Sequence, residues 1–147
     1  MPKLVYFNVQ GRGQACRFLL ANKGVDFEDY RITGEERKQA KENNTYAGAT
    51  GLPVLVEDDG KVLNQQHAIL HYLAMKHGLA PQTAEQQYEM HWFYETGKDH
   101  DNVENAGKAL FMENCTEEFL QIAVDNKTKL FDKYEARFSD GRAHVAG

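Results

Sequence analysis

The chain has 147 residues, of which 41% are hydrophobic and 11% aromatic, and its formal net charge is -5. A chain of this length and composition can bury a hydrophobic core, which excludes an intrinsically disordered protein. The 17 Lys and Arg residues are dispersed among 22 Asp and Glu residues, a pattern that excludes nucleic acid as an expected partner. No apolar run reaches the length of about 18 residues that a membrane span needs, so we expect a cytoplasmic protein that does not enter the membrane.

Apolar runs in the first 41 residues predict two short strands and two helices. Residues 4–7 are typical of a strand, and the glycines of Gly11–Gly13 end it. Apolar positions over residues 14–21 recur at helical spacing, and residues 25–32 suggest a second strand. A polar loop follows, in which we expect a weak helix over residues 35–41.

A hairpin is the clearest signal in the sequence. Residues 52–56 and 61–63 are apolar runs separated by an acidic turn that ends in Gly60, so we expect an antiparallel pair. Residues 68–75 then predict a helix that Gly78 closes. The order strand-helix-strand followed by strand-strand-helix is that of a thioredoxin-like α/β fold.

The second half of the chain has a different pattern. A linker over residues 78–83 contains Pro81, and beyond it the apolar positions follow helical spacing, with a long helix expected to begin near Thr116. The sequence therefore predicts an α/β thioredoxin-like N-terminal domain over residues 1–79 and a partial all-helical, or all-α, C-terminal domain over residues 83–147.

The two cysteines, Cys16 and Cys115, lie far apart and form no Cys-x-x-Cys motif. This spacing argues against a disulfide scaffold and against a plain thioredoxin-like redox protein. We expect both side chains to be buried, reduced thiols.

Three stretches are similar to cytosolic glutathione transferases of the sigma, mu and pi type. They occur in the order and spacing of that family, and the resemblance extends well over residues 3–79 and loosely over 83–147. The stretches are residues 3–8 with Gly11-Arg12 behind them, residues 51–55 and residues 63–73. The resemblance implies a detoxifying transferase that binds glutathione in its N-terminal domain and joins it to a small hydrophobic electrophile. Glutathione would be the co-substrate, with no tightly bound cofactor and no metal.

Tyr6 is the candidate catalytic residue, because only the thiolate of glutathione attacks electrophiles well and a free thiol is mostly protonated at neutral pH. A tyrosine hydroxyl can donate a hydrogen bond to the sulfur, and lowering the thiol pKa by about two units requires about 2.7 kcal/mol. By the resemblance, Tyr6 activates the thiol, and the charge of Arg12, the second arginine of the family's Arg-Gly-Arg turn, supports the thiolate and organises the loop. The first arginine of that turn is Gln10 here. The alternatives are a strand aromatic for Tyr6 and a solvated turn residue for Arg12.

The resemblance also assigns the backbone of Leu52, before a cis Pro53, to the cysteinyl part of glutathione. It assigns Gln65 and Gln66, which open a helix, to the γ-glutamyl carboxylate. The family usually has Gln-Ser at that place, so Gln66 is a departure. An ordinary polar helix start and a trans proline are the alternatives that the residues themselves leave open.

Arg37 and Lys41 are four residues apart, so a helix would place both cations on one face, where they could clamp the glycyl carboxylate. By the resemblance, Arg37 replaces the family's usual tryptophan and Lys41 matches its lysine. A charged, solvated segment is the alternative for this pair.

Two other sites are considered and rejected on the sequence. Gly11-x-Gly13-x-x-Cys16 resembles a dinucleotide-binding fingerprint, but the third glycine is missing and a hairpin follows where that fold needs a parallel sheet. His67 and His71 are four apart and could pair on a metal, but the sequence presents no third ligand.

A non-catalytic structural or scaffolding protein with the transferase fold is the second hypothesis. Gln10, Gln66 and the short helical domain favour it, whereas Tyr6, Arg12, Leu52-Pro53 and Gln65 favour an enzyme. Isomerase or peroxidase activity would use the same thiolate.

The long helix presents an apolar stripe, made of Leu120, Val124, Phe131 and Phe138. A soluble chain seldom exposes such a surface. We therefore expect the chain to be a part of a longer one, or a short form whose stripe another subunit covers in a homodimer or larger assembly. By the resemblance, Tyr46 is suited to contact the partner's helical domain.

Overall fold

A computed structural model describes residues 1–104 and 116–142, with side chains described for residues 1–99 and 116–142. The chain divides into two compact units, Met1–Ala80 and Pro81–Gly147. The first unit is α/β and the second is helical, which confirms the predicted fold class.

The first unit is built on a four-stranded mixed sheet with the order β2-β1-β3-β4. The strands are β1 (Lys3–Tyr6), β2 (Glu28–Arg31), β3 (Val54–Val56) and β4 (Val62–Asn64). β1 is parallel to β2 and antiparallel to β3, and β3 is antiparallel to β4. The predicted hairpin is therefore present, and the sheet is not the parallel one that a dinucleotide-binding fold requires.

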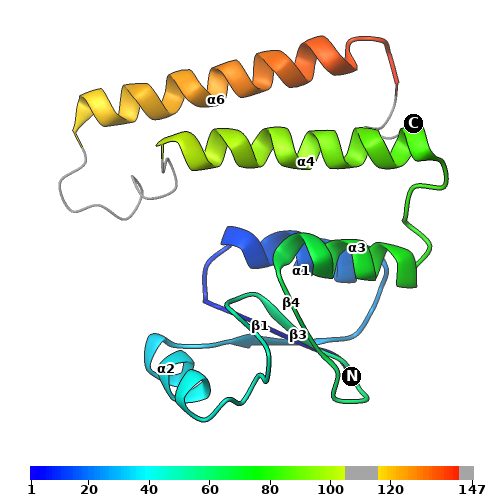
Figure 1. Cartoon of the computed structure of the whole chain (residues 1–147), viewed down its shortest axis with the longest axis vertical. Helices are drawn as coiled ribbons and strands as arrows, with labels where there is room; N and C mark the ends of the chain where they lie inside the picture. Colours follow the sequence, from blue (N-terminus) through cyan, green and yellow to red (C-terminus); the bar gives the residue numbers. More distant parts are fainter. Residues whose placement is uncertain (105–115, 143–147) are drawn as a thin grey trace. The chain divides into compact units, whose positions relative to one another are not determined.

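Three helices accompany the sheet (Figure 1). A short 3-10 turn, η1 (Gly11–Gly13), leads into α1 (Gln14–Asn22), which lies with α3 (Gln66–Lys76) on one face of the sheet. α2 (Gly34–Glu42) lies on the other face and confirms the weak helix predicted there. Its start is stabilised by a capping box in which the Thr33 hydroxyl accepts from the Glu36 backbone N–H and the Glu36 carboxylate accepts from the Thr33 backbone N–H.

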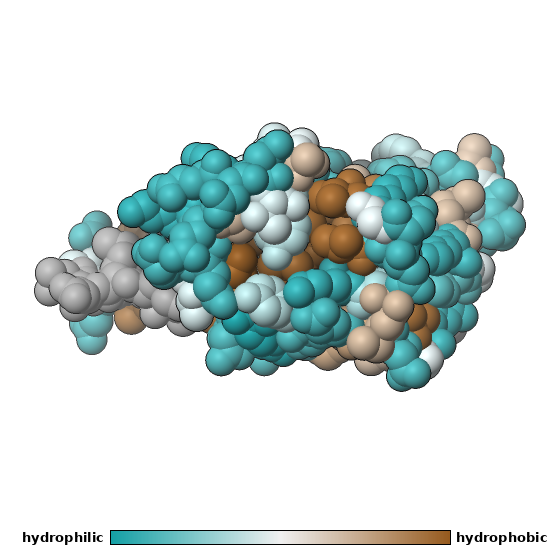
Figure 2. All heavy atoms as spheres, turned by 90° about the horizontal axis from the view of Figure 1, so that it is seen from below, coloured by the Kyte–Doolittle hydropathy of each residue, from teal (hydrophilic) through white to brown (hydrophobic). Residues whose placement is uncertain are grey.

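The two faces of the sheet bury different clusters. The core between the sheet and α1 and α3 consists of Leu4, Cys16, Leu20, Leu55, Ile69 and Leu73. Val5, Ile32 and Val54 form a smaller cluster on the opposite face. In the view from below the sheet, apolar atoms gather over the strands beside the polar surface of α2 (Figure 2). Successive residues of β1 thus point to opposite, covered faces, as in a central strand.

Cys16 is fully buried in the larger core, as predicted. Burial raises the pKa of its thiol to about 11, although the charge of Arg17 acts in the opposite direction. A thiol with this pKa stays protonated and unreactive near neutral pH. Cys115 lies outside the described residues.

The second unit contains α4 (Ala84–Glu104) and α6 (Glu117–Phe138), which run side by side in opposite directions (Figure 1). Aromatic side chains fill the contact between them: the rings of Phe93 and Tyr134 stack at 4.3 Å, and Trp92 and Phe138 flank them. The Tyr134 hydroxyl donates to the Phe93 carbonyl at 2.8 Å. This hydrogen bond offsets the loss of water from the half-buried hydroxyl.

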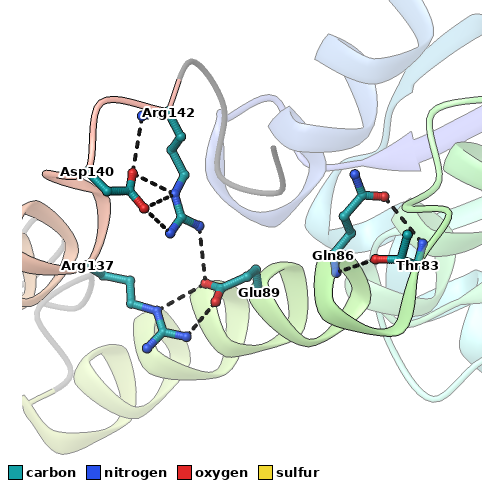
Figure 3. A network of polar contacts seen from close by, with 6 residues as sticks. All are labelled: Thr83, Gln86, Glu89, Arg137, Asp140 and Arg142. Atoms are coloured by element: carbon teal, nitrogen blue, oxygen red, sulfur yellow. Dashed lines mark hydrogen bonds and ion pairs between the residues drawn. The ribbon is translucent and has the colours of Figure 1, made fainter.

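A polar network joins the beginning of α4 to the end of α6 (Figure 3). Glu89 of α4 accepts from Arg137 of α6 at 3.1 and 2.5 Å and lies 3.7 Å from Arg142. Hydrogen bonds from Arg142 lower the pKa of Asp140 to about 2. Thr83 and Gln86 cap the start of α4 by accepting from each other's backbone N–H groups.

None of the described helices is long and apolar enough to cross a membrane.

The apolar stripe of α6 is shorter than predicted. Leu120, Val124 and Phe131 are 47%, 57% and 63% exposed. Phe138, expected in the same stripe, instead packs against Trp92 and Phe93 of α4. The helical period predicted the spacing of these residues, but the direction in which α4 approaches α6 determined which of them are covered.

As a monomer, with no second subunit over the stripe, the chain should bind a fluorescent dye for apolar surfaces there. Phe131→Lys should lower the dye signal, because it replaces the most exposed aromatic side chain of α6 with a charge. The Phe131→Lys variant should also unfold at the same denaturant concentration, because that side chain leaves no cavity when replaced. Hydrogen exchange over residues 116–138 is the second measurement. Strong protection in a monomer without dye uptake would contradict the expectation.

Candidate functional site

Three strand ends meet at one edge of the sheet. Val5 is opposite Val54 in the β1–β3 pair, and Val54 is opposite Asn64 in the β3–β4 pair. The register therefore places the last residue of β1, the residues before β3 and the residues after β4 at the same edge. These are Tyr6, Leu52-Pro53 and Gln65, which are distant in the sequence and were all predicted as site residues.

Tyr6 packs under the glycines of η1. A Cβ atom on Gly11 would lie 2.7 Å from the Tyr6 hydroxyl, and one on Gly13 would lie 2.7 Å from the Tyr6 ring. The backbone can approach the ring this closely because both residues are glycine. The Arg12 backbone N–H donates to the Tyr6 hydroxyl at 3.1 Å. Because this bond uses a lone pair of the Tyr6 hydroxyl oxygen, the hydroxyl proton remains available for a hydrogen bond to a ligand.

Arg17, and not Arg12, holds the loop between β1 and η1 in place. The Arg12 side chain is exposed and makes no ion pair or hydrogen bond with any residue that the structure describes. Arg17 organises the loop instead: it is 6% exposed, and its guanidinium donates to the carbonyls of Phe7 and Val9 at 3.3 and 2.9 Å. The predicted role of Arg12 in organising the turn is thus limited to its backbone N–H.

The sequence contains a signal for Arg17. Its position on α1 falls on the same buried face as Cys16 and Leu20, and a charge on such a face needs a partner. The partner is Asp29 of β2, which accepts from Arg17 Nε at 3.0 Å. Burial acts to raise the pKa of Asp29, but hydrogen bonds from Arg31 and Arg17 outweigh it and lower that pKa.

A cavity of about 150 Å³ lies between α2, the sheet and the loop before β3. Its lining includes both predicted cations, Arg37 and Lys41, together with Leu52. Ile32 and Val54, both buried, contribute apolar lining. The cavity therefore combines an apolar base with two positive charges, an arrangement that suits an organic carboxylate.

Tyr46 also lines this cavity and packs partly against the Val5, Ile32 and Val54 cluster of its own chain. The residue that we expected to contact a partner subunit therefore contributes to the wall of the cavity.

The remaining predicted residues lie around this edge. The Leu52–Pro53 peptide bond is cis, as expected. Gln65 has a φ of 71°, a conformation that non-glycine residues rarely adopt. Its side-chain amide donates at 2.9 Å to the hydroxyl of Thr50, which lines the cavity. Gln66 is the first residue of α3 and is half-buried.

Comparison with known proteins identifies the family. Residues 2–75, half of the chain, match the family model for the glutathione S-transferase N-terminal domain. The chain belongs to the glutathione S-transferase family. It is 39% identical over 85 residues to hematopoietic prostaglandin D synthase of Gallus gallus, a match that covers 58% of this chain and 41% of that protein. It is 30% identical over 147 residues to glutathione S-transferase A4 of Mus musculus, a match that covers 99% of this chain and 66% of that protein.

A solved structure agrees with this assignment. The glutathione S-transferase from Ascaris lumbricoides superposes with a TM-score of 0.85 at 30% identity, covering 100% of this chain and 72% of that one. The thioredoxin-like fold of the glutathione S-transferase N-terminal domain is thus confirmed. The chain spans between 41% and 66% of the lengths of the two curated relatives.

The glutathione S-transferase domain brings Tyr6, Leu52, Pro53 and Gln65 to one sheet edge and Arg37, Lys41 and Leu52 to one cavity. Within the described residues, no three His, Cys, Asp or Glu side chains lie close enough together to hold a metal ion. His67 and His71 lie on α3 and are half-buried.

Proposed function

We propose that the chain carries the glutathione site of a glutathione transferase and that Tyr6 activates the thiol for attack on a small electrophile. The hydrogen bond from the Arg12 backbone N–H to the Tyr6 hydroxyl is the observation that carries the proposal. It orients the hydroxyl at the sheet edge and leaves its proton available to a thiolate.

In this proposal, the three parts of glutathione contact different elements. The glycyl carboxylate lies near Arg37 and Lys41, which line the cavity beside α2. The cysteinyl backbone pairs with Leu52 as an added strand would. The γ-glutamyl carboxylate lies at the start of α3, where Gln65, Gln66 and the free N–H groups of the helix can donate to it.

Catalysis then needs no group beyond the thiol and its surroundings. The thiol loses its proton to solvent, and the hydrogen bond from Tyr6 stabilises the resulting thiolate. The positive charge of Arg12 and the N-terminal end of α1 favour the same anion. The sulfur then forms a bond to the electrophilic carbon, whose leaving group departs with its electron pair.

Calorimetric titration of the full chain with glutathione tests the proposal. The ultraviolet absorbance of the thiolate, compared with that of bound S-methylglutathione as a control that has no thiol, measures ionisation. Binding with a thiolate signal near neutral pH is the expected result. Absence of binding would overturn the proposal, and binding without a thiolate signal would support the non-catalytic protein that Gln10 and Gln66 favour.

One relative suggests a second reaction for the same site. The Gallus gallus protein, 39% identical over 85 residues, is named as a prostaglandin D synthase. A thiolate held at Tyr6 could also serve an isomerisation in which glutathione is regenerated. Product analysis distinguishes the two reactions, because conjugation consumes glutathione and isomerisation does not.

We also propose a cytoplasmic homodimer or larger assembly, in which a second subunit covers the stripe of Leu120, Val124 and Phe131. Sedimentation at micromolar concentration measures the assembly state, and a monomer would reject this part of the proposal.

Gln66→Ser should tighten glutathione binding, because serine restores the compact hydroxyl that the family usually has at the start of this helix. The expected gain is about 1 kcal/mol, the net value of one hydrogen bond. Calorimetry with glutathione measures it. Gln66→Ala is the matched control, since it shortens the side chain without supplying a hydroxyl. Weaker binding of the serine variant would show that Gln66 itself contacts the ligand.

A further inference from the structure

α2 carries the two cations of the cavity, yet little of it is buried. None of its nine residues is buried, and only Ala40 packs partly against the Val5, Ile32 and Val54 cluster. A helix of this length is only marginally stable alone, so other contacts must determine its position. The polar contacts at its first turn therefore matter for the placement of Arg37 and Lys41.

Glu36, in the first turn of α2, connects the helix to the sheet. One carboxylate oxygen accepts from the Thr33 backbone N–H and hydroxyl, both at 2.7 Å. The other oxygen accepts from the Tyr30 hydroxyl at 2.8 Å. The hydrogen bonds from Thr33, followed by the one from Tyr30, lower the pKa of Glu36, so the carboxylate is charged near neutral pH. Hydrogen bonds to a charged group are stronger than those between two neutral groups.

Tyr30 is itself held on the sheet. It lies in β2, opposite Val5 of β1, and its ring packs against the smaller core cluster. The Lys3 ammonium lies 4.1 Å from the ring centroid and pairs with Glu28 at 3.0 Å. The Tyr30 hydroxyl is thus a fixed point of the sheet that reaches the first turn of α2.

We propose that the Tyr30–Glu36 hydrogen bond is a positioning device that holds α2 so that Arg37 and Lys41 face the carboxylate bound in the cavity. Arg37 follows Glu36 directly, and Lys41 lies four residues further along the same helix. A shift of the first turn therefore displaces both cations together. This inference rests on the proposed binding of glutathione, whose glycyl carboxylate would be the group recognised.

Tyr30→Phe tests the inference, because it removes the hydroxyl and retains the ring. Glutathione affinity should fall roughly threefold to tenfold, the range that corresponds to the loss of one hydrogen bond. The rate at saturating glutathione should stay unchanged, because Tyr6 and its turn are untouched. Hydrogen exchange of the α2 amides should become faster.

A ligand without the glycyl group separates positioning from a general structural effect. γ-Glutamylcysteine lacks the carboxylate that Arg37 and Lys41 would bind, so Tyr30→Phe should leave its affinity unchanged. Tyr88→Phe is the matched control, since Tyr88 is 58% exposed and its hydroxyl makes no hydrogen bond to a residue described in the structure.

Three outcomes would overturn the inference. Equal weakening for both ligands would mean that Tyr30 only stabilises the domain, and unchanged glutathione affinity would mean that α2 needs no such contact. In both cases wild-type binding shows that the proposed glutathione site stands. Wild-type protein that binds neither ligand would overturn the proposed function and this inference together.

Discussion

Tyr6→Phe is expected to lower the rate of conjugation about 100-fold at neutral pH while the dissociation constant of glutathione stays nearly unchanged. The factor corresponds to a rise of about two units in the pKa of the bound thiol, or about 2.7 kcal/mol of lost thiolate stabilisation. Binding survives because Arg37, Lys41, Leu52 and Gln65 do not depend on the hydroxyl in this arrangement.

The structure allows the hydroxyl to be removed without disturbing the turn. Phenylalanine keeps the ring that packs under Gly11 and Gly13. The Arg12 backbone N–H loses its acceptor, but Arg12 is exposed, so water can replace the hydroxyl. The loss of activity should therefore exceed the loss of stability.

Arg12→Gln separates the charge of Arg12 from its backbone hydrogen bond. The variant retains the backbone N–H that donates to Tyr6 and removes only an exposed charge. We therefore expect the rate of conjugation to fall by less than about tenfold. Thiolate absorbance and single-turnover rates measure both variants. Equal thiolate signals in wild type and Tyr6→Phe would show that Tyr6 does not activate the thiol.

Arg17→Met is expected to destabilise the first unit by about 3 kcal/mol, the lower end of the cost of removing one partner from a buried ion pair, because the Asp29 side chain is 27% exposed. Methionine fills much of the same space, so the loss reflects the polar groups rather than a cavity. The groups left without their donor are the carbonyls of Phe7 and Val9 and one oxygen of Asp29. The loop before η1 should lose its position as a result.

Arg31→Met provides the matched control, because Arg31 pairs with the same Asp29 carboxylate at 2.7 Å but is exposed. Its loss should cost less than about 1 kcal/mol. Denaturant unfolding measures both variants, and equal small effects would contradict the role assigned to Arg17. The pKa of Asp29 is lowered in the fold. The stability that the Arg17–Asp29 ion pair contributes is therefore fully present above the pKa that Asp29 has in the unfolded chain. It is lost as the pH falls through the lower pKa that Asp29 has in the folded protein.

Local signals in the sequence determined the elements of the first unit. The acidic turn ending at Gly60 predicted the hairpin, and the apolar period predicted α1 and α3. The weak helix predicted at α2 is present, and the structure shows that Thr33 and Glu36 form a capping box at its start. Each of these signals lies within a few residues, so no knowledge of the rest of the chain was needed.

The family resemblance added the candidate site residues, and the sheet register shows why three of them lie close together. Tyr6, Pro53 and Gln65 are separated by 47 and 12 positions in the sequence but lie at one edge because β1, β3 and β4 pair as they do. The sequence by itself therefore determined which residue types were present, and strand pairing determined that they meet.

Only the tertiary structure decided which partner each side chain takes. Arg17 and not Arg12 organises the turn, because the helix period points Arg17 into the core, where Asp29 and two carbonyls surround it. Phe138 is covered because α4 approaches that side of α6. Periodicity predicts the face on which a residue lies, but a partner across the fold depends on how elements pack, and that is a property of the whole chain.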